Sequence, residues 1–212
     1  MENQKINYQK LLDKTISELT ERKTMLLHAC CAPCSSYVIE YLSSFFDITI
    51  YYYNPNIHPE AEYNRRLQEL KDFLGKFPKA LELKVKLIVD SYDTEDYFKA
   101  TKVREEIDLQ TEREMGERCR RCYKFRMKRA WKYAEKNNFD YFTTTLSISP
   151  HKDSSKINKI GADLQEKSTS TLKYLFSDFK KKGGFLRSLE ISEKFGLYRQ
   201  DYCGCVFSMR NR

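Results

Sequence analysis

The seven cysteines of this chain stand in three short groups, and these groups limit what the chain can fold into. They are Cys30, Cys31 and Cys34, then Cys119 and Cys122, then Cys203 and Cys205. The groups are far apart in the sequence, so only a folded domain can bring them together. Thiolates are soft-metal ligands and strong nucleophiles. The cysteines therefore predict metal binding or redox chemistry.

The length argues against a disulfide scaffold. A chain of 212 residues fits one domain and buries roughly 70% of its unfolded surface, so it does not need the staples of small secreted proteins. The segment Met1–Lys23 is polar, without the apolar core of a signal peptide. No run of about 18 apolar residues occurs. We therefore expect a cytoplasmic protein with no membrane partner.

Segments typical of strands and of helices alternate along the chain. Strands are predicted at Met25–Ala29, Ile48–Tyr53, Leu83–Val89 and Tyr141–Thr145. Helices are predicted from apolar residues at helical spacing within Val38–Phe46, Tyr63–Phe77, Cys119–Ala134, Ile157–Leu164 and Phe185–Phe195, with a short helix from about Asp93. This alternation predicts an α/β fold, a parallel sheet with helices on both faces.

Polar residues follow three of the predicted strands. Cys30, Asn54 and Ser147 each come directly after a strand, and His151 and Lys152 follow Ser147 closely. Ligands of parallel sheets bind beyond the carboxyl ends of the strands. We therefore expect these residues to share one rim and form a single site.

Two of the cysteine groups together supply enough ligands for a metal centre. Cys30 and Cys31 with Cys119 and Cys122 give the four thiolates that a cubane iron–sulfur cluster or a tetrahedral zinc ion requires. Adjacent cysteines are unusual in structural zinc sites. The spacing favours iron–sulfur, with zinc and metal-free thiols as the alternatives.

The pair Cys203 and Cys205 indicates a different role. A disulfide across the single residue Gly204 would close a very small, strained ring, and strain raises the reduction potential. The pair is therefore predicted to be a labile redox couple or a metal clip.

The charge is positive overall and concentrated in one segment. The net charge is +8, and eight basic residues without an acid lie between positions 118 and 132: Arg118, Arg120, Arg121, Lys124, Arg126, Lys128, Arg129 and Lys132. A solvated helix face is one interpretation, and a phosphate-contacting surface is the other. Helical spacing predicts that Lys124, Lys128 and Lys132 face water. Seven glycines without a phosphate-binding loop argue against ATP and tightly bound NAD.

Together these motifs resemble the QueH-type epoxyqueuosine reductase family. The matching segments are His28–Cys34, Tyr53–Pro59 with Glu62, Tyr63 and Arg66, Glu117–Tyr123 with Arg126, Thr143–Lys152, Ile157–Gly161 and Tyr198–Cys205. They extend from about Met25 to Ser208. The resemblance implies an adenine-nucleotide α-hydrolase-like fold (HUP, Rossmann-like), with a cysteine loop in place of the nucleotide loop.

The resemblance also implies a reaction and its partners. The reaction is the two-electron reduction of epoxyqueuosine to queuosine at the wobble position of tRNA. The implied partners are a tRNA carrying epoxyqueuosine and an external electron donor; no oligomeric state is predicted. The alternatives are a tRNA sulfur-transfer enzyme of the same lineage, which would need an ATP loop, and a zinc-stabilised RNA-binding module.

Roles for single residues follow from the resemblance. Cys30, Cys31, Cys119 and Cys122 would ligate a [4Fe–4S] cluster, and Cys203 and Cys205 would be a redox-active pair. Cys34 would ligate a second, mononuclear metal ion, expected to be iron. The residues expected to contact the substrate are Asn54, Asn56, Tyr63, Arg66, Ser147, His151 and Lys152. We expect residues 1–24 to be an extension and residues 25–212 to be one catalytic domain, with a redox segment at about 196–208.

Overall fold

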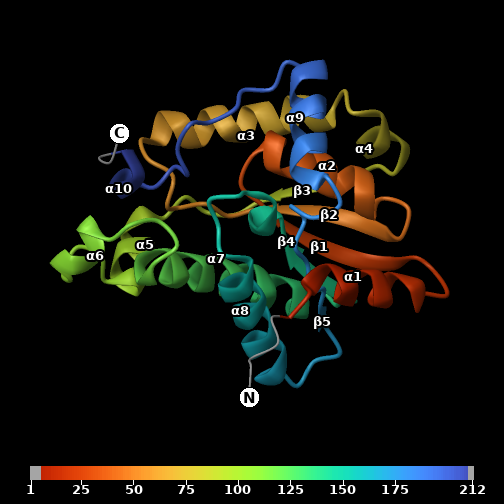
Figure 1. The fold of residues 1–212 in the computed structure, drawn as a ribbon, viewed down its shortest axis with the longest axis horizontal. Helices are drawn as coiled ribbons and strands as arrows, with labels where there is room; N and C mark the ends of the chain where they lie inside the picture. Colours follow the sequence, from red (N-terminus) through yellow and green to blue (C-terminus); the bar gives the residue numbers. More distant parts are fainter. Residues whose placement is uncertain (1–5, 210–212) are drawn as a thin grey trace.

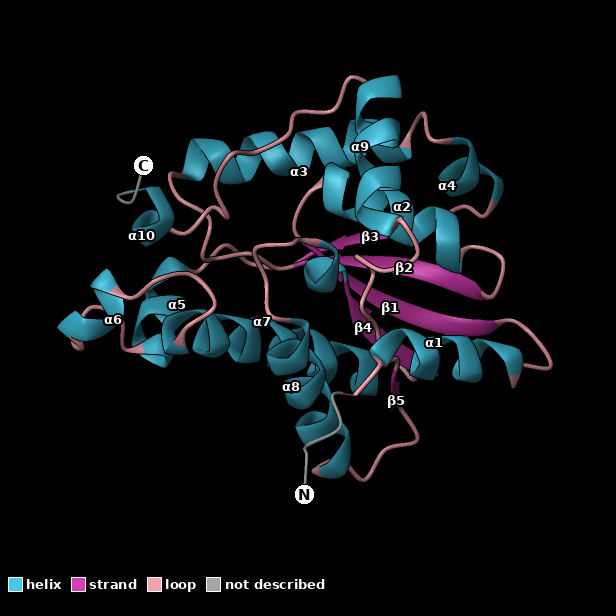
Figure 2. Cartoon of the chain, in the orientation of Figure 1, coloured by secondary structure: helices cyan, strands magenta, loops and turns pink. Residues whose placement is uncertain are grey.

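The sheet of this protein contains five parallel strands (Figures 1 and 2). The structure, a computed structural model, describes residues 6–209. The strands are β1 (Lys23–Ala29), β2 (Phe46–Tyr52), β3 (Lys86–Val89), β4 (Tyr141–Thr144) and β5 (Lys173–Tyr174). Their order across the sheet is β3-β2-β1-β4-β5. The predicted α/β fold with a parallel sheet is therefore confirmed.

Helices connect the strands and cover both faces of the sheet (Figure 1). They are α1 (Tyr8–Ser17), α2 (Ala32–Leu42), α3 (Glu60–Leu74), α4 (Pro78–Glu82), α5 (Thr94–Thr101), α6 (Ile107–Thr111), α7 (Glu117–Lys136), α8 (Ser154–Glu166), α9 (Gly184–Lys194) and α10 (Val206–Met209), with a 3-10 turn η1 (Thr145–Ile148). None of these helices is both long enough and apolar enough to span a bilayer.

The alternation of side chains along β1 divides the core into two layers. Met25, Leu27 and Ala29 point into one cluster, which also contains apolar residues of α2, α3 and α9. Leu26 points to the opposite face, into a cluster formed with α7 and α8. All four residues are fully buried, so the sheet is covered on both sides, as parallel sheets are.

The strand order reverses between β1 and β4. The chain proceeds from β1 through β2 to β3 on one side of the sheet, then returns to place β4 and β5 on the other side of β1. Such a switch point opens a crevice beyond the carboxyl ends of the two strands. Cys30 follows β1 and η1 follows β4, so the cysteine loop lies at this crevice.

Some local predictions were wrong. Phe46 is the first residue of β2, not part of the preceding helix, because α2 ends at Leu42. The third strand is shorter than predicted, since it begins at Lys86. The elements α4, α6, α10 and the two-residue β5 were not predicted, because they are too short to carry a clear period.

Helix α1 lies within the segment expected to be an extension. Its sequence is mostly polar, but Leu12 is fully buried in the cluster of α2 and α9. Asp13 accepts hydrogen bonds from Gln9 and Tyr41, the latter on α2, and forms an ion pair with Lys182. The helix therefore packs on the same core as β1, and the domain division at residue 24 stays a prediction.

Candidate metal and redox site

The first cysteine group lies in the loop from β1 into α2. β1 ends directly before Cys30, and Pro33 occupies the first turn of α2, where its fixed φ suits the start of a helix. The sulfur atoms of Cys30, Cys31 and Cys34 all lie within 4.8 Å of one another. All three thiols are free. Three convergent thiols can hold a thiophilic metal ion.

Cys30 is the most acidic thiol of this group. Hydrogen bonds from Cys31 and Cys34 lower the pKa of Cys30 well below the usual value for a thiol, and the positive charge of Lys152 adds to the effect. The hydrogen bond to Cys30 raises the pKa of Cys31 well above that value and the pKa of Cys34 to about 12. Without metal, Cys30 therefore carries the negative charge of the group.

The third cysteine group forms a tight turn around Gly204. Its φ of +98° lies in the region that favours glycine, and a Cβ there would come within 2.8 Å of Ile57. The backbone N–H of Cys205 donates to Cys203 Sγ at 3.4 Å, and the Ser208 hydroxyl oxygen lies 3.3 Å from the same sulfur. A hydrogen bond from the Cys205 thiol lowers the pKa of Cys203 well below the usual value. Cys203 is therefore the more acidic of the pair.

Arg66 and His58 hold this turn against the β2–α3 segment. The guanidinium of Arg66 donates to the carbonyls of Cys203 at 3.2 Å and Tyr202 at 3.3 Å. The backbone N–H of His58 donates to the Gly204 carbonyl at 2.8 Å, and the Tyr202 hydroxyl donates to the His58 carbonyl at 2.7 Å. The motif around residues 54–66 therefore docks the C-terminal cysteine turn.

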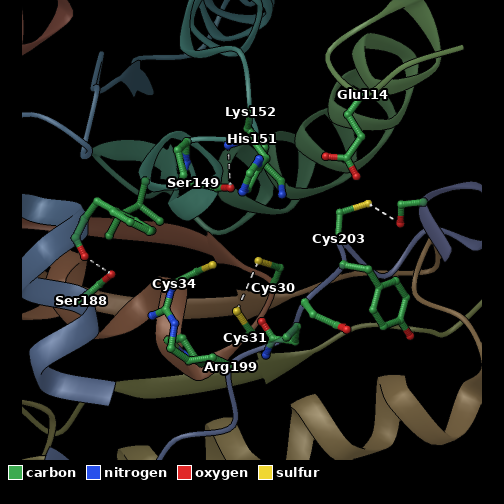
Figure 3. Close-up of a pocket in the computed structure, with 18 of the residues that line it drawn as sticks. Cys30, Cys31, Cys34, Glu114, Ser149, His151, Lys152, Ser188, Arg199 and Cys203 are labelled. Atoms are coloured by element: carbon green, nitrogen blue, oxygen red, sulfur yellow. Dashed lines mark hydrogen bonds between the residues drawn. The ribbon is translucent and has the colours of Figure 1, made fainter. Parts of the chain in front are cut away.

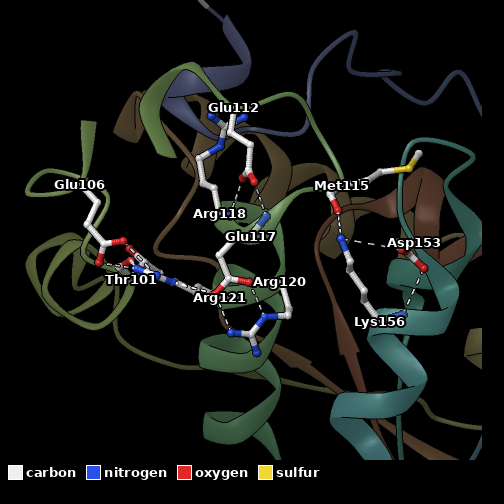
Figure 4. Close-up of polar contacts among 10 residues, drawn as sticks. All are labelled: Thr101, Glu106, Glu112, Met115, Glu117, Arg118, Arg120, Arg121, Asp153 and Lys156. Atoms are coloured by element: carbon white, nitrogen blue, oxygen red, sulfur yellow. Dashed lines mark hydrogen bonds and ion pairs between the residues drawn. The ribbon is translucent and has the colours of Figure 1, made fainter. Parts of the chain in front are cut away.

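The second cysteine group lies in the first two turns of α7, whose start is fixed by Glu112 (Figure 4). The Glu112 carboxylate accepts hydrogen bonds from the first two backbone N–H groups of the helix, at 2.6 and 2.7 Å. A Cβ on Gly116 would lie 2.1 Å from Glu112, so this approach requires glycine. Burial raises the pKa of Cys122, and it raises the pKa of Cys119 to about 11.

A small cavity of about 20 Å³ brings the second and third cysteine groups together. Cys119, Cys122, Cys203 and Cys205 all line it. The Tyr97 hydroxyl closes one side, 3.9 Å from Cys205 Sγ. The fold thus places the cysteines of α7 beside the C-terminal pair.

A larger cavity of about 490 Å³ opens beside the first cysteine group (Figure 3). Cys30, Cys31, Cys34 and Cys203 lie on its wall. The cavity is also lined by the cations Arg66, Arg113, Lys152 and Arg199, by the acidic Glu114 and Asp201, and by His151. The four cations are matched by these two carboxylates and by the thiolates of Cys30 and Cys203, so the lining combines both signs of charge.

Lys152 lies where the two cavities meet. It lines both of them, as Cys203 does. Burial disfavours the ammonium form of Lys152, but the negative charges of Cys203 and Cys30 outweigh this and raise the pKa of Lys152. The ammonium is therefore a fixed positive charge between the cysteine groups.

The residues predicted to contact the substrate divide into two sets. Arg66, His151 and Lys152 line the large cavity, and Asn56 lines the small one. Arg66 also has the structural role described above.

Asn54, Tyr63 and Ser147 line neither of these two cavities. Asn54 is fully buried and donates to the Ala29 carbonyl at 2.9 Å. Tyr63 stacks on Tyr92 with 4.1 Å between ring centroids. Ser147 lies within η1 and is fully buried, and its hydroxyl forms hydrogen bonds inside the protein. Their contact with substrate stays a prediction.

The basic run on α7 divides into three classes. Arg118 and Arg126 are buried, Arg120, Arg121 and Arg129 form ion pairs with carboxylates, and Lys124, Lys128 and Lys132 are exposed. Within residues 6–209 the three lysines form no ion pair. The prediction that the three lysines face water is confirmed. Of the eight basic residues, these three are the ones that are exposed and form no ion pair within residues 6–209.

Several residues that line the two cavities were not predicted as site residues from the sequence. Arg113 and Glu114 lie in a polar stretch without a period, and Arg199 lies in a segment without a predicted element. Arg126 did have a usable signal, because it stands four residues after Cys122 and so shares its helix face.

Comparison with known proteins identifies the relatives of this chain. The family described as "Epoxyqueuosine reductase QueH" matches residues 25–211. The chain belongs to this family. A relative of that name from Streptococcus pyogenes serotype M1 is 42% identical over 98% of this chain and 80% of its own length.

Two further relatives with the same name support the assignment. The one from Staphylococcus epidermidis is 42% identical over 98% of this chain and 87% of its own length. The one from Thermotoga maritima is 36% identical over 89% of this chain and 92% of its own length. The chain is therefore an oxidoreductase, and its cysteine loop fits a metal-binding reductase.

Proposed function

We propose that this protein reduces epoxyqueuosine to queuosine at the wobble position of tRNA. The observation that carries the proposal is the convergence of Cys30, Cys31 and Cys34 within 4.8 Å on the wall of the large cavity. Family membership names the reaction. The exposed lysines Lys124, Lys128 and Lys132 of α7, which form no ion pair within residues 6–209, support a polyanionic substrate such as tRNA.

The reaction consumes two electrons and two protons. Both C–O bonds of the epoxide break, a carbon–carbon double bond forms, and the oxygen leaves as water. A [4Fe–4S] cluster, when bound, supplies single-electron transfer. The protein must therefore also provide a second source of reducing equivalents and a route for protons to the departing oxygen.

The thiols suit such a cluster and a second metal ion. The first group contains soft sulfur donors, which favour iron–sulfur clusters or zinc over hard cations. We propose Cys30, Cys31, Cys119 and Cys122 as the cluster ligands, and Cys34 as a ligand of a mononuclear iron. Cys30 and Cys31 line the large cavity and Cys119 and Cys122 line the small one, and the two cavities share Cys203 and Lys152, so the proposed ligands lie around adjoining spaces.

The pair Cys203 and Cys205 is proposed as the dithiol. Oxidation of the Cys203 thiolate and the Cys205 thiol to a disulfide releases the two electrons that the epoxide consumes and one proton, and the ammonium of Lys152 can supply the second proton. The acidity of Cys203 supports this role, since the thiolate is the reactive form of cysteine. An external donor must then reduce the disulfide again, as is usual for working disulfides in the cytoplasm.

Lys152 and His151 are proposed to contact the substrate at the cavity wall. Lys152 is protonated, so it can hold the epoxide oxygen by a hydrogen bond and donate a proton as the C–O bond breaks. The exposed lysines of α7 are proposed to bind tRNA phosphates. We also propose substrate contacts for Arg66 and Asn56, which line the cavities, and for Asn54, Tyr63 and Ser147, which line neither of them.

One preparation tests the proposal. The protein is purified without oxygen, its iron and acid-labile sulfide are measured, and it is incubated with tRNA carrying epoxyqueuosine and a chemical reductant. We expect visible thiolate-to-iron absorption and conversion of the nucleoside to queuosine, measured by mass spectrometry of digested tRNA. Zinc without iron, together with tRNA binding but no conversion, would instead favour the RNA-binding module.

A further inference from the structure

Arg126 carries a buried positive charge next to the cysteine groups. It lies on α7, four residues after Cys122, and its side chain is 2% exposed. One of its terminal nitrogens lies 4.0 Å from Cys122 Sγ, and the other donates to the Asn54 amide oxygen. Its third nitrogen, Nε, is buried without a hydrogen-bond partner.

Two other arginines are buried to the same degree but have better partners. Arg66 forms an ion pair with Glu62 at 2.6 Å. Arg118 donates to two backbone carbonyls, those of Leu109 and Gln110, at 2.7 and 3.1 Å. Arg126 has no carboxylate partner within residues 6–209. Arg118 has no carboxylate partner either, but two carbonyls accept its hydrogen bonds, whereas Nε of Arg126 has no acceptor and one of its terminal nitrogens faces Cys122 Sγ. A buried charge without a counter-charge is costly, and the Cys122 thiol is a group in contact with Arg126 that can supply one.

Arg126 also links two cysteine groups through a chain of hydrogen bonds. It binds Asn54, and Asn54 donates to the carbonyl of Ala29 at 2.9 Å, directly before Cys30. The guanidinium therefore reaches from Cys122 on α7 to the end of β1. The groups that can carry negative charge around it are the thiols of Cys122, Cys30 and Cys203.

We propose that Arg126 is a positioning residue that supplies the positive charge opposite the thiolates of the Cys30 and Cys122 groups. This inference rests on the proposed function, because it assumes that these cysteines hold an iron–sulfur cluster. Net charge and hydrogen bonds to sulfur set the potential of such clusters. A cation that faces the sulfurs favours the reduced, more negative state and so raises the potential.

The test compares three variants of the iron-loaded protein. Arg126→Met removes the charge at similar volume, and Arg126→Lys keeps the charge but removes the planar fork. Arg129→Met makes the same change three residues further along α7, at a side chain that is 52% exposed and paired with Asp90. Iron and sulfide are measured for each variant, and the midpoint potential is measured by redox titration followed in the visible spectrum.

We expect Arg126→Met to keep its iron and to shift to a more negative midpoint potential, while Arg126→Lys and Arg129→Met stay close to wild type. Loss of iron in Arg126→Met but not in Arg126→Lys would also support the inference, since it would show that the charge holds the thiolates. An unchanged or more positive potential in iron-loaded Arg126→Met would overturn it.

Three other outcomes also count against the inference. Equal loss of iron in Arg126→Met and Arg126→Lys, or equal potential shifts, would assign the effect to the shape of the fork and not to its charge. If the wild-type protein itself held no iron, the proposed function would fail, and this inference with it. If the wild-type protein held a normal cluster and the Arg126 variants changed neither its iron content nor its midpoint potential, this inference would fail while the proposed function would stand.

Discussion

Lys152 and Cys203 lie together at the boundary of the two cavities, and each favours the charged form of the other. The hydrogen bond from Cys205 lowers the pKa of Cys203 most; burial opposes this shift, and the positive charge of Lys152 adds to it. The thiolate of Cys203 in turn raises the pKa of Lys152. This pair gives the site one thiolate and one ammonium at neutral pH.

The first prediction concerns the reactivity of Cys203 in metal-free protein. A lowered pKa means that the thiolate, and so the alkylation rate, persists below the pH at which an ordinary thiol is protonated. We expect Lys152→Gln to move the half-maximal rate of Cys203 alkylation to higher pH, and Cys205→Ala to move it further. Mass spectrometry after iodoacetamide treatment measures the rate; an unmoved midpoint in both variants would contradict the pairing.

The second prediction concerns the cluster ligands. Replacing any one of Cys30, Cys31, Cys119 or Cys122 with alanine should sharply lower bound iron, because a cubane cluster needs four thiolates. Iron analysis and the visible spectrum of anaerobic protein measure the decrease. A variant that kept full iron would remove its cysteine from the ligand set.

The third prediction separates chemistry from assembly. Cys203→Ser and Cys205→Ser should keep the cluster spectrum but abolish most of the conversion of epoxyqueuosine, because the dithiol supplies reducing equivalents. The assay is mass spectrometry of nucleosides under multiple turnovers. Loss of iron in both variants would make these cysteines ligands instead.

The fourth prediction concerns tRNA binding by the exposed lysines of α7. Changing Lys124, Lys128 and Lys132 to glutamine should weaken binding most at low salt. The log–log slope of affinity against salt should flatten by about one unit for each lysine that binds a phosphate in the wild-type protein. The cluster spectrum should not change.

A matched control uses lysines on another surface. Lys71 on α3, Lys84 after α4 and Lys194 on α9 are exposed, these helices pack on the face of the sheet opposite α7, and changing the three lysines to glutamine alters the net charge equally. An equal effect of both triple variants would mean that total charge, and not this helix, governs tRNA affinity.

The fifth prediction concerns the stability supplied by α1. Leu12→Ala should lower the free energy of unfolding by about 2–5 kcal/mol, because it leaves a cavity in the core. Leu11 is the neighbouring control, since it is 38% exposed, and Leu11→Ala should cost far less. Urea denaturation of both variants measures the difference; equal values would mean that α1 does not share the core.

Local sequence patterns predicted the central elements well and the short ones poorly. The apolar run before Cys30 and the helical period of Met127 to Ala134 each have one interpretation, and both were confirmed. Phe46 was assigned to the preceding helix because it stands at helical spacing from the apolar residues of that helix. An apolar residue at this position is equally compatible with the start of a strand, which is what the structure has. Leu12 was missed because the segment is mostly polar, although Leu12, Ile16 and Leu19 stand at helical spacing and all pack on the core.

The grouping of the cysteines could be predicted only in part. Sequence spacing joins Cys30 to Cys34, but it cannot say that Cys119 and Cys122 lie beside Cys203, since that depends on how α7 and the C-terminal turn pack. The same limit applies to Arg126. A run of positive charges suggests a solvated helix face, whereas Arg126 is buried, with its guanidinium hydrogen-bonded to Asn54.

The docked turn around Gly204 also determines the order in which the site is made. Synthesis proceeds from the amino end, so the ribosome releases the loop of Cys30 long before the segment that Arg66 and His58 hold in place. During that interval the loop has no wall opposite it, and its thiols are open to water and to any free metal. The large cavity therefore gains the part of its wall that contains Cys203 only after the C-terminal turn has been translated and docked.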